Sequence, residues 1–246
     1  MIDLHCHLYP GVDDGPASDA ESVALARALV AVGVTTAACT SHVRPDKGWM
    51  NTRVGDGERQ QHLRALLHEA AVPLGITNGA EHYVDATVFG SLDILANLAV
   101  PYGTSRWLLV ETPYLGEPPQ LMELLASVRR RGFRVLLAHA ERFPYLSDKS
   151  EYAQRLVDAG MVLQVNLGSF AGAYNRAQQK NAERLLKEGF VGVLAGDCHR
   201  AADVDDNIVK GRAAAAKLVT AAMLHKLTVT NPRMILDDAA PEAVWP

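Results

Sequence analysis

The sequence contains few cysteines, and their number is odd. Cys6, Cys39 and Cys198 cannot all pair within one chain, so a framework of disulfide bonds is not expected. The sequence also lacks any apolar run of the roughly 18 residues that a membrane span requires. Its first residues contain neither the basic nor the apolar stretch of a signal peptide. We therefore expect a protein of the reducing cytoplasm that does not insert into a membrane.

An excess of positive charge is also missing. The formal net charge is -4 at pH 7, and 21% of the residues are charged, which is close to the average for globular proteins. This balance gives no reason to expect nucleic acid or an anionic membrane as the main partner. Attraction for a phosphate-bearing substrate would have to come from local cations, either bound metal ions or a few arginines.

The chain is long and apolar enough for one large core. It has 246 residues, of which 48% are hydrophobic, and α/β barrels of this length are routinely single domains. Linkers, internal repeats and low-complexity segments are absent from the sequence. A single domain over residues 1–246 is therefore expected.

Short apolar runs alternate with amphipathic segments along the chain. Seven apolar runs are predicted strands, at 2–7, 35–42, 74–82, 106–111, 134–139, 162–167 and 191–197. Cap residues or glycines delimit predicted helices at 19–32, 120–131, 151–159 and 181–188. Two polar stretches are predicted loops, at 44–57 and 115–119.

The short connections between these units predict parallel strands with right-handed crossovers. Both an open sheet and a closed barrel fit this pattern. Polar residues follow the apolar runs at the ends of at least six strands. The C-terminal strand ends of a barrel meet at one mouth, whereas an open sheet concentrates its site at a switch point. We therefore favour an α/β barrel with its site at the C-terminal strand ends.

The first and last apolar runs have the same arrangement of side chains. The first ends in His-Cys-His at 5–7, and the last in Asp-Cys-His at 197–199. Residues i and i+2 of a strand share a face, so each cysteine points away from its two neighbours. Cys6 and Cys198 are therefore expected to be small buried residues and not nucleophiles, since neither lies in an anion-binding loop that would activate a thiolate.

Side chains that bind metals end the other strands as well. Five of the nine histidines and three carboxylates lie where an apolar run stops: His5, His7, His42, His139, His199, Glu81, Glu111 and Asp197. Uncompensated convergence of three carboxylates would raise their pKa values and destabilise the site. Bound cations remove that penalty, so the pattern predicts a site for several metal ions. The ligand set alone is compatible with manganese, iron or zinc.

The segment after the first strand contains Asp13 and Asp14 among glycines and prolines. These residue types form turns, so an ordinary turn explains the composition. Alternatively, the turn carries Asp13 or Asp14 back over the mouth as a further ligand. The spacing alone does not choose between these interpretations.

The motifs together resemble those of the bacterial capsule-type (CpsB-type) tyrosine phosphatases of the polymerase-and-histidinol-phosphatase (PHP) superfamily. The resemblance covers essentially the whole chain, through the motifs at 1–7, 12–16, 41–42, 79–81, 111, 139–142 and 197–199. It implies a distorted (β/α)7 barrel that hydrolyses phosphotyrosine in proteins. A histidinol phosphatase or another phosphoesterase on the same scaffold is the nearest alternative.

The resemblance also implies three divalent metal ions, usually manganese. The implied ligands of the first ion are His5, His7, Glu81 and Asp197. Those of the second are Glu81, Glu111 and His139, and those of the third are Asp14, His42 and His199.

Arg142 lies just beyond the fifth strand and is the main candidate to bind phosphate; an ordinary surface ion pair is the alternative. The family carries a further arginine several residues after the position of His199, and this chain does not. Arg200 and Arg44 are therefore the candidates for a second phosphate contact. His199 and Asp197 are the candidates to donate a proton to the leaving phenol.

Three side chains near the predicted loops are candidates to grip an aromatic substrate: Trp49, Met50 and Tyr114. Ordinary loop packing explains them equally well. As partner, the resemblance implies the tyrosine-rich tail of a bacterial kinase that controls polysaccharide export.

Two other classes compete with a phosphatase. An amidohydrolase-like barrel usually has a lone Asp after its last strand and often a modified Lys on strand four, whereas here Glu111 ends strand four and His199 accompanies Asp197. A barrel that only binds a partner would not need ligand-type residues at every strand.

Overall fold

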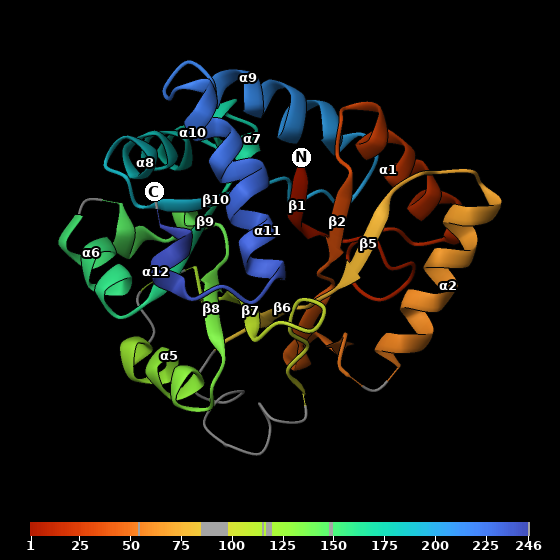
Figure 1. The fold of residues 1–246 in the computed structure, drawn as a ribbon, viewed down its shortest axis with the longest axis horizontal. Coiled ribbons are helices and arrows are strands. Elements are labelled where there is room, and N and C mark those ends of the chain that lie inside the picture. Colours follow the sequence, from red (N-terminus) through yellow and green to blue (C-terminus); the bar gives the residue numbers. More distant parts are fainter. Residues whose placement is uncertain (54, 85–97, 115, 117–119, 148–149, 246) are drawn as a thin grey trace.

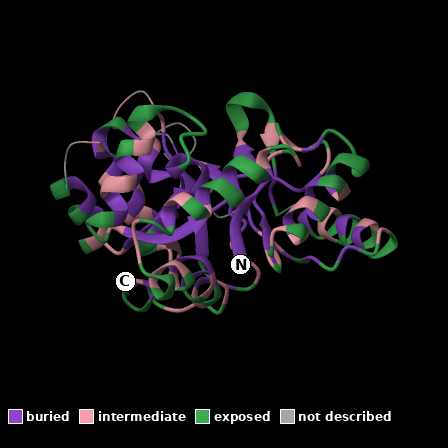
Figure 2. Cartoon of the chain, turned by 90° about the horizontal axis from the view of Figure 1, so that it is seen from above, coloured by how far each residue is buried: buried purple, intermediate pink, exposed green. Residues whose placement is uncertain are grey.

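The structure is a computed structural model that describes residues 1–53, 55–84, 98–114, 116, 120–147 and 150–245. Strands lie at the centre and helices surround them (Figure 1). Buried residues are concentrated in the strands, and exposed residues lie on the outer faces of the helices (Figure 2). The fold is therefore mixed α/β. No helix in the described part of the chain is both long and apolar enough to span a membrane.

The strands form two sheets. The smaller has the order β1-β2-β5, and the larger has the order β10-β9-β8-β7-β6-β3-β4. Neighbouring strands are parallel except for the antiparallel pair β3 and β4. Their bounds are β1 (Ile2–Cys6), β2 (Thr36–Cys39), β3 (His42–Arg44), β4 (Trp49–Met50), β5 (Gly75–Asn78), β6 (Glu81–Tyr83), β7 (Trp107–Glu111), β8 (Arg134–Leu137), β9 (Met161–Asn166) and β10 (Val191–Ala195).

Each predicted strand overlaps one or two observed strands, and two of the predicted strands are interrupted. Residues 40–41 separate β2 from β3, and residues 79–80 separate β5 from β6. The Asn51 side-chain amide donates to the carbonyls of Ser41 and Gly79, at 3.0 Å each. This buried amide thus bonds a backbone acceptor at each of the two interruptions.

The two sheets also meet at β1 and β10. Cys6 and Cys198 form an isolated parallel bridge. The His7 N–H donates to Cys198 O at 3.0 Å, and the Asp197 N–H donates to His5 O at 2.7 Å. These bonds place the ends of the first and last strands side by side.

The helices are α1 (Asp19–Ala31), α2 (Asp56–Glu69), α5 (Leu121–Arg130), α6 (Ser150–Asp158), α7 (Leu167–Phe170), α8 (Arg176–Lys187), α9 (Gly211–Ala215), α10 (Ala221–His225), α11 (Asn231–Leu236) and α12 (Pro241–Val244). Each predicted helix is present. The predicted helix at 181–188 begins earlier, at Arg176, because the Asn175 side chain accepts the N–H of Gln178 and caps the helix there.

The prediction of a loop over 44–57 is wrong in part. Residues 42–50 form a β-hairpin, in which Val43 pairs with Met50 and Arg44 with Trp49. Gly48 closes its turn with a φ of +74°, a backbone conformation that glycine adopts without strain. Helix α2 then begins at Asp56. The other predicted loop, at 115–119, lies outside the described residues except for Gly116.

The inner faces of the strands pack together. One apolar cluster combines side chains of β1, β2, β7, β8, β9 and β10 with Ile235 of α11 and Val244 of α12. Helix α11 lies across the strands in Figure 1. Two further clusters fill the space between the strands and the outer helices. The C-terminal helices thus cover one end of the strands and leave the other end for the site.

Gly211 marks a close contact between α9 and α7. A Cβ added there would collide with the backbone carbonyl of Leu167. Gly211→Ala is therefore expected to lower the free energy of unfolding by about 1–3 kcal/mol, measured by urea denaturation. Gly57→Ala in α2 is the matched control, because a Cβ there meets open space, and it should be neutral or stabilising by up to about 1 kcal/mol. Equal losses in both variants would contradict the predicted collision.

Candidate metal centre

The predicted ligands meet at the C-terminal ends of the strands. A cavity of about 530 Å³ opens there, and its walls include Asp14, His42, Glu81, Glu111, His139, Asp197 and His199. The remaining two, His5 and His7, are fully buried beside them. All nine side chains therefore lie around one cavity, although they are spread from position 5 to position 199 of the chain.

Glu81 lies at the centre of this group. Its Oε2 is 3.2 Å from His5 Nε2, 3.4 Å from His7 Nε2 and 3.1 Å from His42 Nδ1. Its Oε1 is 2.7 Å from His139 Nε2. Glu81 is the first residue of β6, directly after the interruption that Asn51 bridges. The interruption therefore fixes where this carboxylate enters the cavity.

The buried carboxylates need neighbouring positive charge in order to remain ionised. Burial alone would raise the pKa of Glu81, but the neighbouring histidines hold it well below the usual range. Burial and the charge of Glu81 raise the pKa of Glu111 to about 8. Burial would lower the pKa of His5, but Asp197 and Glu81 raise it to about 9. Protons on these groups stand in for the cations that the carboxylates would otherwise bind.

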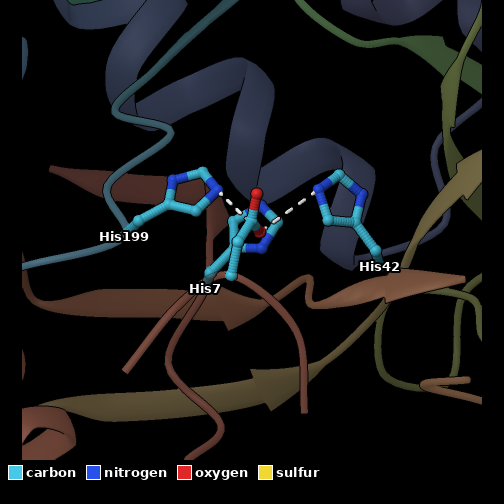
Figure 3. A group of neighbouring side chains, drawn as sticks. His7, His42 and His199 are labelled. Carbon is cyan, nitrogen blue, oxygen red and sulfur yellow. Dashed lines mark ion pairs between the residues drawn. The ribbon is translucent and has the colours of Figure 1, made fainter. Parts of the chain in front are cut away.

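A second part of the site gathers three imidazoles around Asp14. Asp14 Oδ1 is 3.6 Å from His42 Nε2 and 3.4 Å from His199 Nε2. The rings of His7 and His199 are stacked, with centroids 3.9 Å apart. Figure 3 shows His42 and His199 turned toward a common point from opposite sides, with His7 between them.

The two aspartates of the first turn have different positions. Asp14 is half-exposed and faces the imidazoles, whereas the Asp13 carboxylate is buried behind them. Asp13 Oδ2 is 2.7 Å from His7 Nδ1 and accepts the His42 N–H at 2.8 Å. Its Oδ1 accepts the Gly15 N–H at 3.0 Å. Asp13 therefore orients the imidazole of His7 and ties the turn to β3.

The donor atoms of the site fit divalent metal ions. Four groups have ligand atoms within 4.8 Å of one another: His7, Asp14, His42 and His199; His5, His7 and Glu81; His5, His139 and Asp197; and His42, Glu81 and Glu111. Buried atoms of five of these residues make no hydrogen bond within the described structure: His5 Nε2, His7 Nε2, His42 Nδ1, Glu111 Oε2 and His139 Nδ1. Burial also lowers the pKa of His139 to about 4, so its imidazole is neutral and able to bind a metal.

Arg142 lines the same cavity. Its guanidinium lies 4.6 Å from the centre of the Tyr114 ring and 5.6 Å from that of Tyr174. Its Nη1 is 3.7 Å from Asp197 Oδ2. Two aromatic faces and one carboxylate thus hold this cation in place beside the ligand group.

The two other predicted arginines also line the cavity, but in different surroundings. The Arg44 guanidinium is 3.9 Å from the centre of the Tyr83 ring, and its Nη1 is 3.7 Å from Glu111 Oε2. Arg200 is exposed, and its N–H donates to Asp203 Oδ2 at 2.8 Å. Arg44 is therefore anchored among the ligands, whereas Arg200 lies on the rim.

The predicted aromatic grip is only partly present. Trp49 lines the cavity and stacks on His42, with ring centroids 5.2 Å apart. Tyr114 also lines it, and its hydroxyl donates to the Glu111 carboxylate. Met50 is exposed but does not line the cavity. Tyr174 also lines the cavity, and this aromatic residue was not predicted from the sequence.

The sequence analysis also missed two amides of β9. Gln164 and Asn166 are fully buried, and they contact residues that end the neighbouring strands. Their spacing could have indicated them. A strand covered on both faces is expected to be apolar throughout, and here two polar side chains at i and i+2 interrupt the apolar run.

The sequence of the chain matches one protein family over most of its length. A family model described as capsular polysaccharide synthesis, CpsB/CapC, matches residues 1–237. The chain is 31% identical over 245 residues to the tyrosine-protein phosphatase CpsB of Streptococcus pneumoniae, covering 97% of this chain and 99% of that protein. It is 26% identical over 201 residues to the tyrosine-protein phosphatase YwqE of Bacillus subtilis, covering 81% of this chain and 77% of that protein.

A solved structure has the same fold. It comes from work on YwqE from Bacillus subtilis and CpsB from Streptococcus pneumoniae, described as unique metal-dependent tyrosine phosphatases. The TM-score is 0.88 at 24% sequence identity, and the match covers 98% of this chain and 96% of that chain.

Proposed function

The chain belongs to the CpsB/CapC family of capsular polysaccharide synthesis, and from this we propose that it is a metal-dependent protein-tyrosine phosphatase. The observation that carries the proposal is the set of imidazoles and carboxylates whose ligand atoms surround one cavity together with Arg142. The proposed reaction is hydrolysis of the phosphate monoester of phosphotyrosine.

The scaffold of this activity is, in our proposal, a single domain built as a distorted (β/α)7 barrel. Seven strands remain when each interrupted strand is counted once and β4, the antiparallel strand of the hairpin, is left out. The contact between β1 and β10 and the apolar cluster shared by six strands support closure of the ring. In such a barrel the strand ends converge at one mouth, where the cavity lies.

We propose that the site holds three divalent ions of manganese, with iron or zinc as alternatives. The first ion would be held by His5, His7, Glu81 and Asp197, the second by Glu81, Glu111 and His139, and the third by Asp14, His42 and His199. The short distances from Glu81 to four imidazoles support its place between ions. When bound, such ions lower the pKa of water to about 7 and offset charge on phosphoryl oxygens.

The residues of the chain have separate tasks in this reaction. The Arg142 guanidinium binds two oxygens of the phosphoryl group and stabilises the charge that develops on them. Arg44 is the better second candidate for a phosphate contact, because it already lies beside Glu111. Arg200 on the rim is the weaker one.

Of the two candidates to donate a proton to the leaving group, Asp197 is the weaker. Burial would raise the pKa of this carboxyl, but His5 and His199 hold it well below its usual range. His199 remains the candidate donor. The phenol of tyrosine has a pKa of about 10 and therefore needs less protonation than an alkoxide would.

We infer that the natural substrate is a phosphotyrosine-containing protein, and specifically the tyrosine-rich tail of a bacterial kinase of polysaccharide export. The capsule context of the family and the names of the relatives support this inference. The walls of the cavity include residues of both the β3–β4 hairpin and the 197–207 segment.

A panel of substrates tests the proposed function. Phosphotyrosine peptide, phosphoserine peptide and histidinol phosphate are assayed side by side with manganese-loaded protein. Phosphotyrosine peptide should be hydrolysed with the highest kcat/KM. A preference for histidinol phosphate would replace the proposed function with that of a small-molecule phosphatase.

Arg142→Ala is expected to lower kcat/KM for phosphotyrosine peptide by roughly 100-fold, because a charge-assisted contact to the transferring group contributes about 3 kcal/mol. Arg142→Lys should recover only part of the loss, since a lysine offers no planar pair of donors. Arg155→Ala is the matched control. Arg155 also stacks on a tyrosine, at 5.3 Å from the ring of Tyr152, but on an outer helix. An unchanged kcat/KM in Arg142→Ala would remove Arg142 from the site.

A further inference from the structure

We propose that Gln164 and Asn166 act together as a positioning device for three of the proposed metal ligands. These two residues, the β9 amide pair, lie on a strand that supplies no ligand itself. Strand β9 lies between β8 and β10 in the sheet, and His139 and Asp197 follow those two strands. The inference rests on the proposed metal centre and not on the phosphatase reaction.

The β9 amide pair contacts one atom of each of the three ligands. Gln164 Oε1 is 3.1 Å from His5 Nδ1 and accepts the His139 N–H at 2.9 Å. Gln164 Nε2 donates to Asn166 Oδ1 at 2.7 Å. Asn166 Nδ2 donates to Asp197 Oδ2, also at 2.7 Å. A continuous chain of hydrogen bonds therefore runs from β1 to the end of β10.

One backbone group fixes which atom donates and which accepts in each of these hydrogen bonds. The N–H of His139 only donates, so the Gln164 atom that faces it must be the carbonyl oxygen. The Gln164 nitrogen then faces Asn166, which must present its own oxygen to it. The Asn166 nitrogen is left to donate to the Asp197 carboxylate, which only accepts. Every amide orientation along the chain follows from that single N–H.

The same logic fixes the tautomer of His5. Because Gln164 Oε1 only accepts, the neutral His5 imidazole must carry its proton on Nδ1. The lone pair then lies on Nε2, which is 3.2 Å from both Glu81 Oε2 and Asp197 Oδ1 and has no hydrogen bond within the described structure. The β9 amide pair thus prepares His5 to bind a cation and holds Asp197 with one oxygen free for the same cation.

Hydrogen-bond partners of metal-bound residues typically change metal affinity by about 10- to 100-fold. Gln164→Leu keeps the size of the side chain but leaves His5 and the His139 N–H without an acceptor. The apparent Kd for Mn²⁺ of the metal-stripped full chain is therefore expected to rise by about 10- to 100-fold, measured by competition with a fluorescent chelator. Gln164→Glu keeps an oxygen for both donors and loses only the bond to Asn166, so its Kd should rise less than that of Gln164→Leu.

Two controls separate positioning from general damage. Leu163→Ala removes a fully buried side chain of the same strand that packs in an apolar cluster, on the face of β9 opposite to Gln164. It should lower the melting temperature of the metal-free protein and leave the Kd within about twofold of wild type. Gln154→Leu makes the same chemical change as Gln164→Leu on the exposed face of α6 and should change neither quantity.

Each result bears on one proposal only. A wild-type chain that binds no Mn²⁺ would overturn the proposed metal centre. A wild-type chain that binds Mn²⁺, together with an unchanged Kd in Gln164→Leu, would overturn the role of the β9 amide pair alone. A Kd that rises as much in Leu163→Ala, or equally in Gln164→Leu and Gln164→Glu, would overturn it too.

Discussion

Removal of divalent ions with a chelator should reduce hydrolysis of a phosphotyrosine peptide by about a thousandfold or more, and Mn²⁺ should restore it. Ions at this site contribute several kcal/mol of transition-state stabilisation, and each 1.36 kcal/mol corresponds to a factor of ten in rate. The measurement is kcat before stripping, after stripping and after readdition, with metal content by elemental analysis of the same samples.

Two comparisons make this result specific. Mg²⁺ should restore less activity than Mn²⁺, because Mg²⁺ prefers oxygen ligands and five of the nine proposed ligands are histidines. Mn²⁺ should also raise the melting temperature of the stripped protein, since an ion that binds only the folded state stabilises it. Full activity of protein shown to be free of metal would end the proposal of metal-dependent catalysis.

The second large effect is expected from Asp197→Ala. Asp197 Oδ1 faces His5, and its Oδ2 faces Arg142 and Asn166. Its removal takes away a negative charge that the ions require and leaves the Arg142 guanidinium without its carboxylate neighbour. Turnover should fall at least 100-fold, with loss of bound metal, measured as kcat and as ions per chain.

His7→Ala should have an effect of the same size, because His7 lies between the two parts of the site. Asp158→Ala is the matched control for the loss of a carboxylate: this residue ends α6 and bonds only the exposed Gln154 side chain among the described contacts. It should keep wild-type turnover. If Asp197→Ala or His7→Ala keeps full turnover, the cavity is not the active site.

Local periodicity was sufficient to predict the strands and to place the proposed ligands at their ends. An apolar run that stops at His, Glu or Asp shows where a strand ends, and parallel strands bring such ends together. This is why side chains as distant in sequence as His5 and His199 could be grouped before any coordinates were known. The interruptions of the second and third strands were not predictable, because the amide that bonds to both of them belongs to Asn51, which lies outside either strand.

Residues that act through other residues leave a weaker signal. Asp13 and Asp14 have the same chemistry and adjacent positions, and only the fold shows which one faces the imidazoles. Gln164 resembles a polar residue at the end of a strand until its distances to His5 and His139 are known. The β3–β4 hairpin was hidden because its pairing covers only four residues, which is too short for a periodic pattern.

Tyr114 connects a proposed metal ligand with the candidate phosphate-binding cation. Its hydroxyl donates to Glu111, while its ring lies against the guanidinium of Arg142. A substitution of this one side chain would therefore disturb the surroundings of both groups at once.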